Sequence, residues 1–268
     1  MSEVIVVTSG KGGVGKTTTT ANVGNALARL GFSVLLIDTD IGLRNLDVVM
    51  GLENRVVYNL MDVVEGNCKP KQAILKDRYS DNLFMLPAAQ TKDKTDLVPE
   101  QMKKLIKQLK YDYDYIILDC PAGIEHGFKN AVYCAERALI VTTPDVSAIR
   151  DADRIIGILN SIEMPRIDLI VNKVRHNMVK RGDMMDAYDV ADILAINLIG
   201  YIEDEEIISV SSNRGESIFD TRSKVKRAYD NIALNITGKG MLSEEKQSLF
   251  NWLKKKDKDV HKIQSQRL

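Results

Sequence analysis

The chain has 268 residues and equal numbers of basic and acidic side chains, so its formal net charge is zero. This balance excludes a protein whose whole surface attracts polyanions, and any attraction to nucleic acid or to a membrane must come from a local patch. No apolar run approaches the ~20 residues that span a bilayer, and the three cysteines without a Cys-x-x-Cys pair predict a reduced, cytoplasmic setting.

The first predicted elements are a strand at residues 4–7 and a helix at residues 17–30, joined by a glycine-rich loop. The loop has two glycines separated by four residues and followed by Lys and Thr, which is the pattern that cradles phosphate. Glycines let several backbone N–H groups point at one anion, and the first turn of the helix adds its positive dipole end. We therefore predict a nucleotide phosphate site made by Gly10, Lys11, Gly12, Gly13, Val14, Gly15, Lys16, Thr17 and Thr18.

Two side chains of this loop have predicted roles from the pattern itself. Lys16 supplies a mobile positive charge for the phosphates, and Thr17 supplies a hydroxyl for Mg²⁺. A loop that only turns the strand into the helix is the alternative, and the long match between a strand and a helix argues against it. Lys11 is a second lysine, one residue after the first glycine, and its charge alone carries no assignment.

The block Lys-Gly-Gly-Val-Gly-Lys-Thr-Thr at residues 11–18 resembles the deviant P-loop of the MinD/ParA family of ATPases, whose signature residue is the early lysine. The resemblance extends over residues 1 to about 237. It implies a homodimer that holds two ATP molecules between its subunits. In such a dimer, Lys11 of each subunit reaches the phosphates held by the other.

Two further predicted strands end in acids: residues 33–38 close on Asp38, with Asp40 two positions later, and residues 115–119 close on Asp119. Doubly wound sheets bind ligands at the carboxyl ends of their strands, although acids that merely cap the next helix are the alternative. The resemblance implies that Asp40 orients the attacking water, and that Asp38 and Asp119 organise the Mg²⁺ shell. The predicted catalytic residues are Lys11, Lys16, Asp40 and Asp119, and the predicted metal ligands are Thr17, Asp38 and Asp119.

The remaining predicted elements also alternate. We expect short helical pieces at 58–65 and 70–75, strands at 83–87, 137–142, 167–171 and 197–202, and helices at 99–110, 147–163 and 224–236. Ser147 is predicted to cap the helix at 147–163, whose mixed-charge surface is either solvated or partner-binding. Asn172 follows a strand, and its amide can pair with an adenine edge, although an Asn that starts a turn is the alternative. Glu203 stands where the family commonly has a proline beside the base.

This alternation predicts an α/β fold with a doubly wound, mostly parallel sheet and helices on both faces, as in a P-loop NTPase. The ATPase domain is predicted at residues 1–237, followed by a flexible linker and an amphipathic membrane-targeting helix at 238–268. On a helix, the large apolar residues of this tail fall within an arc of ~160° beside lysines. A coiled coil or a core-docking helix is the alternative. The predicted membrane-binding residues are Leu249, Phe250, Trp252, Leu253, Lys254 and Lys255.

The combined interpretation is a dimerising membrane-switch ATPase that uses ATP and Mg²⁺ and lies peripherally on the inner face of the cell membrane. The resemblance implies control of septum placement, slow intrinsic turnover, and division-inhibitor and ATPase-stimulating partners resembling MinC and MinE. A ParA-like partition ATPase that binds nucleoid DNA through a basic patch is the alternative, although no specific nucleic acid is expected. An electron carrier resembling the nitrogenase iron protein is a third class, with Cys120 and Cys134 as candidate ligands.

Overall fold

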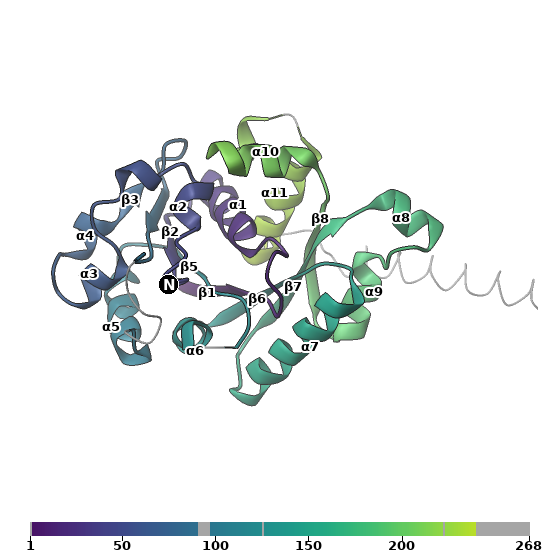
Figure 1. Ribbon diagram of the computed structural model, residues 1–268, viewed down its shortest axis with the longest axis horizontal. Helices are drawn as coiled ribbons and strands as arrows, with labels where there is room; N and C mark the ends of the chain where they lie inside the picture. Colours follow the sequence, from purple (N-terminus) through teal and green to yellow (C-terminus); the bar gives the residue numbers. More distant parts are fainter. Residues whose placement is uncertain (1, 91–96, 125, 222, 240–268) are drawn as a thin grey trace, which may run out of the picture.

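A central parallel sheet organises the computed structural model, which describes residues 2–90, 97–124, 126–221 and 223–239. The strands lie in the order β3-β4-β2-β5-β1-β6-β7-β8, and all neighbours are parallel except β3 and β4 (Figure 1). β1, which precedes the glycine-rich loop, therefore lies in the middle of the sheet. The strands are Glu3–Thr8 (β1), Val34–Asp38 (β2), Leu75–Lys76 (β3), Leu83–Leu86 (β4), Tyr115–Asp119 (β5), Arg137–Thr142 (β6), Ile167–Val174 (β7) and Asn197–Glu203 (β8).

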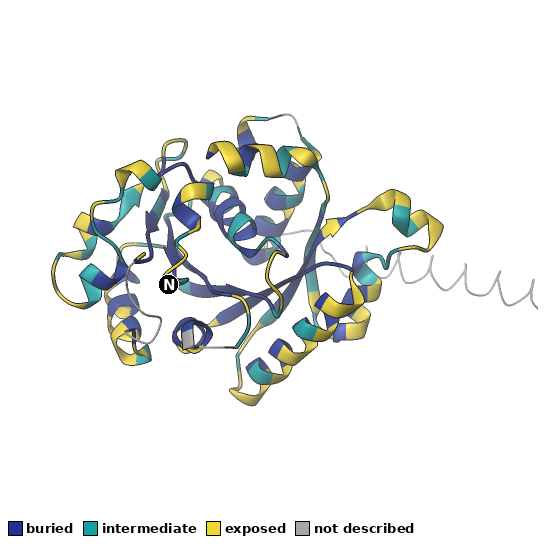
Figure 2. Ribbon diagram, viewed as in Figure 1, coloured by how far each residue is buried: buried dark blue, intermediate teal, exposed yellow. Residues whose placement is uncertain are grey.

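Helices cover both faces of the sheet, as Figure 2 shows by the dark buried strands between the yellow outer surfaces of the helices. The helices are Lys16–Arg29 (α1), Leu46–Val49 (α2), Leu60–Val64 (α3), Pro70–Ala73 (α4), Pro99–Leu109 (α5), His126–Val132 (α6), Val146–Ser161 (α7), His176–Arg181 (α8), Ala187–Leu194 (α9), Glu206–Arg214 (α10) and Lys224–Ile236 (α11). Short 3-10 turns lie at Glu53–Arg55 (η1) and Ile218–Asp220 (η2).

The two cores follow from the two-residue period of a strand. In β1, Val4 and Val6 belong to the core shared with α3, α5, α6, α7 and α9, whereas Ile5 and Val7 belong to the core shared with α1 and α11. Because both faces are covered, the central strands are continuous apolar runs rather than alternating ones. This is why their positions were readable from the sequence.

The predicted doubly wound, mostly parallel fold is confirmed, with several local corrections. The structure adds β3, a two-residue antiparallel strand whose first residue falls at the end of the helical piece predicted at 70–75. It also adds α2, α6, α8, α9 and α10, each of nine residues or fewer, too short for a clear helical period. The helix predicted at 147–163 ends at Ser161, and Glu163 has a left-handed φ of 56°.

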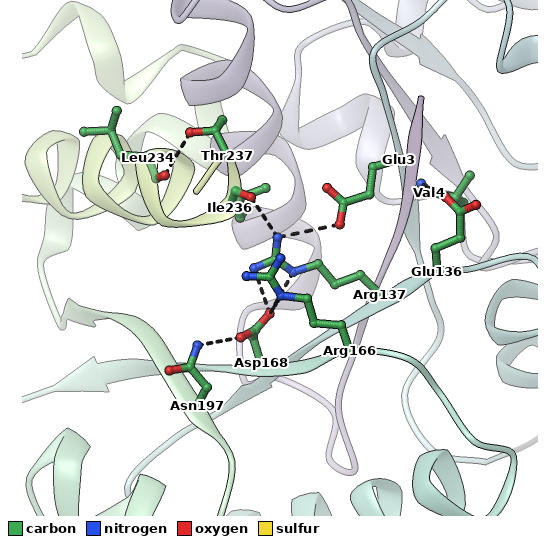
Figure 3. A network of polar contacts seen from close by, with 10 residues as sticks. All are labelled: Glu3, Val4, Glu136, Arg137, Arg166, Asp168, Asn197, Leu234, Ile236 and Thr237. Carbon is green, nitrogen blue, oxygen red and sulfur yellow. Dashed lines mark hydrogen bonds and ion pairs between the residues drawn. The ribbon is translucent and has the colours of Figure 1, made fainter. Parts of the chain in front are cut away.

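A buried polar network closes the amino edge of the sheet, away from the glycine-rich loop (Figure 3). Arg137 begins β6 and is fully buried; its Nε donates to Oδ2 of Asp168 at 2.7 Å, and its Nη1 donates to the carbonyl of Ile236 at 3.0 Å. Asn197 donates to the other oxygen of Asp168 at 2.6 Å. The network therefore ties the starts of β6, β7 and β8 to the end of α11.

Candidate functional site

The glycine-rich loop connects β1 to α1 at the carboxyl edge of the sheet, and its backbone is shaped by glycine. Gly13 and Gly15 have φ values of 76° and 96°, in the left-handed region that side chains other than glycine rarely adopt. Gly15 is the N-cap residue of α1, and no side chain caps this helix. The first N–H groups of α1 are thus left for an external acceptor, which is the arrangement that binds phosphate.

β7 supports the loop from one side. The Nδ2 group of Asn172 donates to the carbonyl of Val14 at 2.8 Å, and Nζ of Lys173 donates to the carbonyl of Gly13 at 2.8 Å. A Cβ atom at Gly15 would overlap the Asn172 amide, so glycine is required there for this contact. These bonds hold the shape of the phosphate cradle.

Asn172 itself differs from its predicted position at a strand end, because β7 continues through Val174. Its Oδ1 accepts from the N–H of Lys173 at 2.9 Å, so one donor and the acceptor of its amide serve the protein backbone. The second hydrogen on Nδ2 leaves room for another acceptor. The adenine contact stays a prediction.

α7 supports the loop from the other side. Nζ of Lys11 donates to Oγ of Ser147 at 2.9 Å, and a side chain at Gly10 would overlap the backbone of Asp151. The predicted Ser147 cap is therefore wrong: α7 begins at Val146, with Asp145 at the N-cap position and no side-chain cap. Ser147 instead lies in the first turn, where it accepts a hydrogen bond from the signature lysine.

The acids at the ends of β2 and β5 lie side by side. Asp38 and Asp119 are paired in the register of β2 and β5, and both are buried. Burial raises the pKa of the Asp38 carboxyl, and the neighbouring Asp119 raises it further. Burial also raises the pKa of Asp119, although a hydrogen bond from Thr17 and the charge of Lys16 oppose that shift.

This donor set fits Mg²⁺. Asp38 and Asp119 supply hard carboxylate oxygens, and the Thr17 hydroxyl contacts the same Asp119. A divalent cation would offset the repulsion between the two carboxylates, which adds to burial in raising the pKa of Asp38. Within the described residues no group of three or more His, Cys, Asp or Glu side chains is placed to hold a metal without further ligands.

The segment after β2 is held by hydrogen bonds to the Asp38 carboxylate. One oxygen of Asp38 accepts from the N–H of Asp40 at 2.9 Å, and the other accepts from the N–H of Leu46, the first residue of α2, at 3.2 Å. Asp40 is half-buried at the same edge, and its charge acts on the pKa of Asp119. Asp38 thereby connects the end of β2 to the start of α2.

The segment after β5 also contacts the loop. The N–H of Gly123 donates to the carbonyl of Ser9 at 3.1 Å, and Pro121 packs against Gly127 in α6. Cys120 lies in the core, where burial raises the pKa of its thiol. Cys134 is half-buried, and burial raises the pKa of its thiol to about 11. Neither thiol ionises readily in this protein.

Sequence reasoning missed three supports of the cradle: Ser147, Lys173 and the backbone of Asp151. Each acts through a contact between segments more than 130 residues apart in the chain, so no local pattern marks it. The one sequence signal that could have found Lys173 is its position directly after Asn172. The predicted membrane-binding residues lie outside the described residues. Among the described helices, none combines the length and apolar character required to cross a bilayer.

The fold and the cradle define a class: a P-loop nucleotide-binding ATPase with a second lysine in its loop. Comparison with known proteins narrows this class. Residues 2–174 match the family described as AAA domain. The chain is 56% identical over 246 residues to the septum site-determining protein MinD of Bacillus subtilis (strain 168), covering 90% of this chain and 91% of that protein.

Solved structures agree with this match. The MinD of the Aquifex aeolicus MinC:MinD cell division protein complex superposes with a TM-score of 0.84 at 47% identity, covering 90% of this chain and 98% of that one. MinD of Pyrococcus horikoshii OT3, complexed with Mg-ADP, has a TM-score of 0.80 at 29% identity, over 88% of this chain and 96% of that one. The chain belongs to the MinD family of septum site-determining P-loop ATPases.

Proposed function

We propose that this protein hydrolyses ATP, forms a homodimer with ATP, attaches to the inner face of the cell membrane through its tail, and regulates placement of the division septum. The observation that carries this proposal is that the two lysines of the loop differ in burial and in direction. Lys16 is buried in the cradle, whereas Lys11 is exposed and reaches out of it to Ser147. A lysine that its own site does not need is available to a second subunit.

The site residues divide the chemistry among them. The N–H groups at the start of α1 and the Lys16 ammonium hold the phosphates, and Asp40 orients the attacking water. Thr17, Asp38 and Asp119 hold Mg²⁺, which when bound neutralises charge on the phosphate oxygens. Among the residues that form the cradle, no arginine is placed to stabilise the negative charge of the transition state. We therefore expect slow intrinsic turnover. Asn172 contacts the adenine.

Dimerisation follows from the position of Lys11. In the free subunit its ammonium is bonded to a neutral hydroxyl on α7, and the phosphates of a partner subunit offer a stronger, charge-assisted acceptor. Moving Lys11 from Ser147 to the partner removes a contact between the P-loop and α7. Nucleotide state is thereby coupled to the surface of α7.

Two kinds of protein partner fit this arrangement. The relative in the Aquifex aeolicus structure is solved with MinC, and we propose a MinC-like division inhibitor as a partner here. Arg150, Asp153 and Arg154 are exposed on α7, and we propose that a stimulating protein resembling MinE, or a substitute for it, acts on this face. Charge reversal at Asp153 should then reduce stimulation and leave basal turnover near normal.

Liposome sedimentation tests the membrane switch. The wild-type protein should sediment with anionic vesicles in ATP and much less in ADP, because two tails held in one dimer bind with a high effective concentration. Replacing Phe250, Trp252 and Leu253 with Ser should abolish sedimentation and leave ATP binding and dimerisation intact. Sedimentation of that triple variant at the wild-type level would contradict the proposal.

The same preparation separates the partition-ATPase alternative. Retention of duplex DNA by the ATP dimer, with a steep loss of binding as salt rises, would replace the membrane by the nucleoid as the target. Equal sedimentation in ADP and ATP would instead support membrane binding and refute its control by nucleotide. A variant with only Gln247 changed to Ser is a matched tail control, because it alters neither the apolar residues nor the lysines.

A further inference from the structure

A polar cavity lies between α1, α2 and α10. Its lining includes Asn25 of α1, Met50 directly after α2, Asp77 before β4, Ser211 of α10, and Ser217 after α10. None of the described lining residues belongs to the phosphate loop or to the acids at the ends of β2 and β5. The cavity volume is about 30 Å³, which is enough for one small ion or one or two water molecules.

The elements around the cavity are in direct contact with one another. Gly51 and Gly215 follow α2 and α10, and a Cβ atom on either glycine would overlap the backbone of the other. The two helices therefore meet through their backbones at these ends (Figure 1). The Nδ2 group of Asn25 donates to Oγ of Ser217 at 3.2 Å, which connects α1 to the segment after α10. The size of the cavity is thus fixed by the fold.

Oxygen atoms of buried side chains are available to this cavity. Asp77 is 9% exposed, and its Oδ2 accepts from the N–H groups of Tyr79 and Ser80 at 2.8 and 2.9 Å, which leaves its other oxygen for a ligand. Asn25 uses its Nδ2 group toward Ser217, so its Oδ1 remains an acceptor. Ser211 is 2% exposed, and its hydroxyl has no hydrogen-bond partner among the described residues. A ligand would satisfy this buried hydroxyl.

The charge of the cavity is negative. Its described lining contains two acids, Asp77 and the exposed Glu216, and no Lys, Arg or His. Burial raises the pKa of the Asp77 carboxyl, which shows that the carboxylate is poorly solvated there. Arg55 acts weakly on Asp77 from outside the lining, and its Nη1 donates to the carbonyl of Lys76 at 3.0 Å. A cation in the cavity would therefore meet an acid that has no close partner of opposite charge.

We propose that this cavity binds one monovalent cation, K⁺ in a cell, through oxygens of Asp77, Asn25 and Ser211. One carboxylate with neutral amide and hydroxyl oxygens balances a single positive charge. Mg²⁺ fits less well, because it keeps several of its water molecules and the cavity is too small for a hydrated ion. The site is separate from the proposed Mg²⁺ site beside Asp38 and Asp119, and it does not rest on the proposed function.

A cation here would connect three elements that the nucleotide also needs. α1 begins at the phosphate loop, and α2 begins at Leu46, whose N–H donates to Asp38. Asn25 lines the cavity from α1, and Met50 lines it from the end of α2. The ion would stabilise this arrangement without any nucleotide, which distinguishes it from ions that accompany phosphates.

Urea unfolding of the protein without nucleotide and without Mg²⁺ tests the site. KCl is compared with N-methyl-D-glucamine chloride at equal ionic strength, because this organic cation screens charges equally but is too large for the cavity. At a K⁺ concentration ten times the dissociation constant, the ratio of folded to unfolded protein should rise about ten-fold over the organic salt. Equal stability in the two salts would overturn the proposal.

Two variants locate the effect. Asp77→Asn removes the charge and keeps an acceptor for Tyr79 and Ser80, and Ser211→Ala removes one hydroxyl; both should weaken the dependence on K⁺. Asp81→Asn is the matched control, because Asp81 is in the same loop but its side chain is 92% exposed and pairs with Lys76. Asp81→Asn should keep the full dependence on K⁺.

Asp38→Asn should also keep the dependence on K⁺, since the proposed ion does not bind at the nucleotide site. Loss of the dependence in Asp38→Asn together with its persistence in Asp77→Asn would place the ion beside Asp119 and overturn the proposal.

Crystals grown in RbCl give a direct view, because Rb⁺ replaces K⁺ and scatters anomalously. An anomalous peak beside Asp77 and Ser211, absent in crystals of Asp77→Asn, is the expected result. No peak in the cavity would overturn the proposal. A peak without any effect of K⁺ on unfolding would show an adventitious ion only. None of these measurements involves ATP or lipid, so their failure leaves the proposed function untouched.

Discussion

Arg137 and Arg166 offer a matched test of how burial sets the strength of an ion pair, because both contact the same oxygen of Asp168. Arg137 is fully buried and lies 2.7 Å from Oδ2, whereas the Arg166 side chain is 49% exposed and lies 3.2 Å from it. Replacing each with Met removes the charge and keeps most of the side-chain volume. Any difference between the variants therefore reports burial and geometry rather than residue type.

The expected costs differ by severalfold. Arg137→Met leaves the buried Asp168 carboxylate with Asn197 and a half-exposed arginine, and it also leaves the Ile236 carbonyl without its donor. Removing one partner of a buried pair costs about 3–5 kcal/mol, and the remaining partners place this case near the lower end. Arg166→Met should cost less than about 1 kcal/mol, because its pair is screened by solvent.

Thermal and urea unfolding, followed by circular dichroism in the absence of nucleotide, measure these costs. For a domain of this size, about 3 kcal/mol corresponds to a midpoint lowered by roughly 6–12 °C. Adding Asp168→Asn to Arg137→Met should recover part of the loss, since it removes the uncompensated buried charge. Equal destabilisation by Arg137→Met and Arg166→Met, or no recovery in the double variant, would refute the reasoning.

Three further predictions concern the nucleotide site. Lys11→Ala should lose ATP-dependent dimerisation and hydrolysis but keep partial ATP binding, measured by size-exclusion chromatography and phosphate release; normal turnover would contradict a role between subunits. Asp40→Ala should bind ATP and remain dimeric while turnover falls at least 100-fold, because an interaction made only in the transition state leaves binding intact. Asp38 has a raised pKa, so its protonated form is favoured by folding, and the nucleotide-free protein should lose stability as pH rises above about 4. Asp38→Asn should flatten that loss in pH-dependent unfolding and abolish stabilisation by Mg²⁺ with ADP; an unchanged pH profile would show that burial does not raise the pKa of the Asp38 carboxyl.

Much of the sheet was predictable because its strands are buried on both faces. The run Tyr115–Asp119 is apolar until its last residue, so both its boundaries and its terminal acid were readable. The short α8 was not, because none of its residues is buried and no apolar period marks it. The two-residue β3 exists only through its pairing with β4, which no local sequence signal encodes.

The site was predictable where chemistry is local and unpredictable where it is not. Gly13, Gly15, Lys16 and Thr17 stand within one short loop, and the pattern fixes their arrangement. Ser147 was wrongly predicted to cap α7, because the preference of serine for helix starts is a local signal. Its hydrogen bond with Lys11 joins residues 136 positions apart, which no local signal marks. Arg137 stands at the first position of a strand, which in sequence resembles an exposed end, whereas in the fold its side chain contacts Asp168 on β7 and the end of α11.

The phosphate cradle has two electrostatic features that an anion bound together with Mg²⁺ would complement. The start of α1 has no capping side chain, and Asp38 and Asp119 lie buried beside each other. A phosphate bound together with Mg²⁺ would complement both features, since the phosphate would accept hydrogen bonds at the start of α1 and the cation would lie beside the two carboxylates. Because the Asp38 carboxylate also accepts hydrogen bonds from the N–H groups of Asp40 and Leu46, a ligand at Asp38 would act on the segment that leads into α2. Lys11, by contrast, already has a partner in Ser147 of the same subunit, so the proposed transfer of Lys11 to another subunit requires that the phosphates there outcompete one neutral hydroxyl.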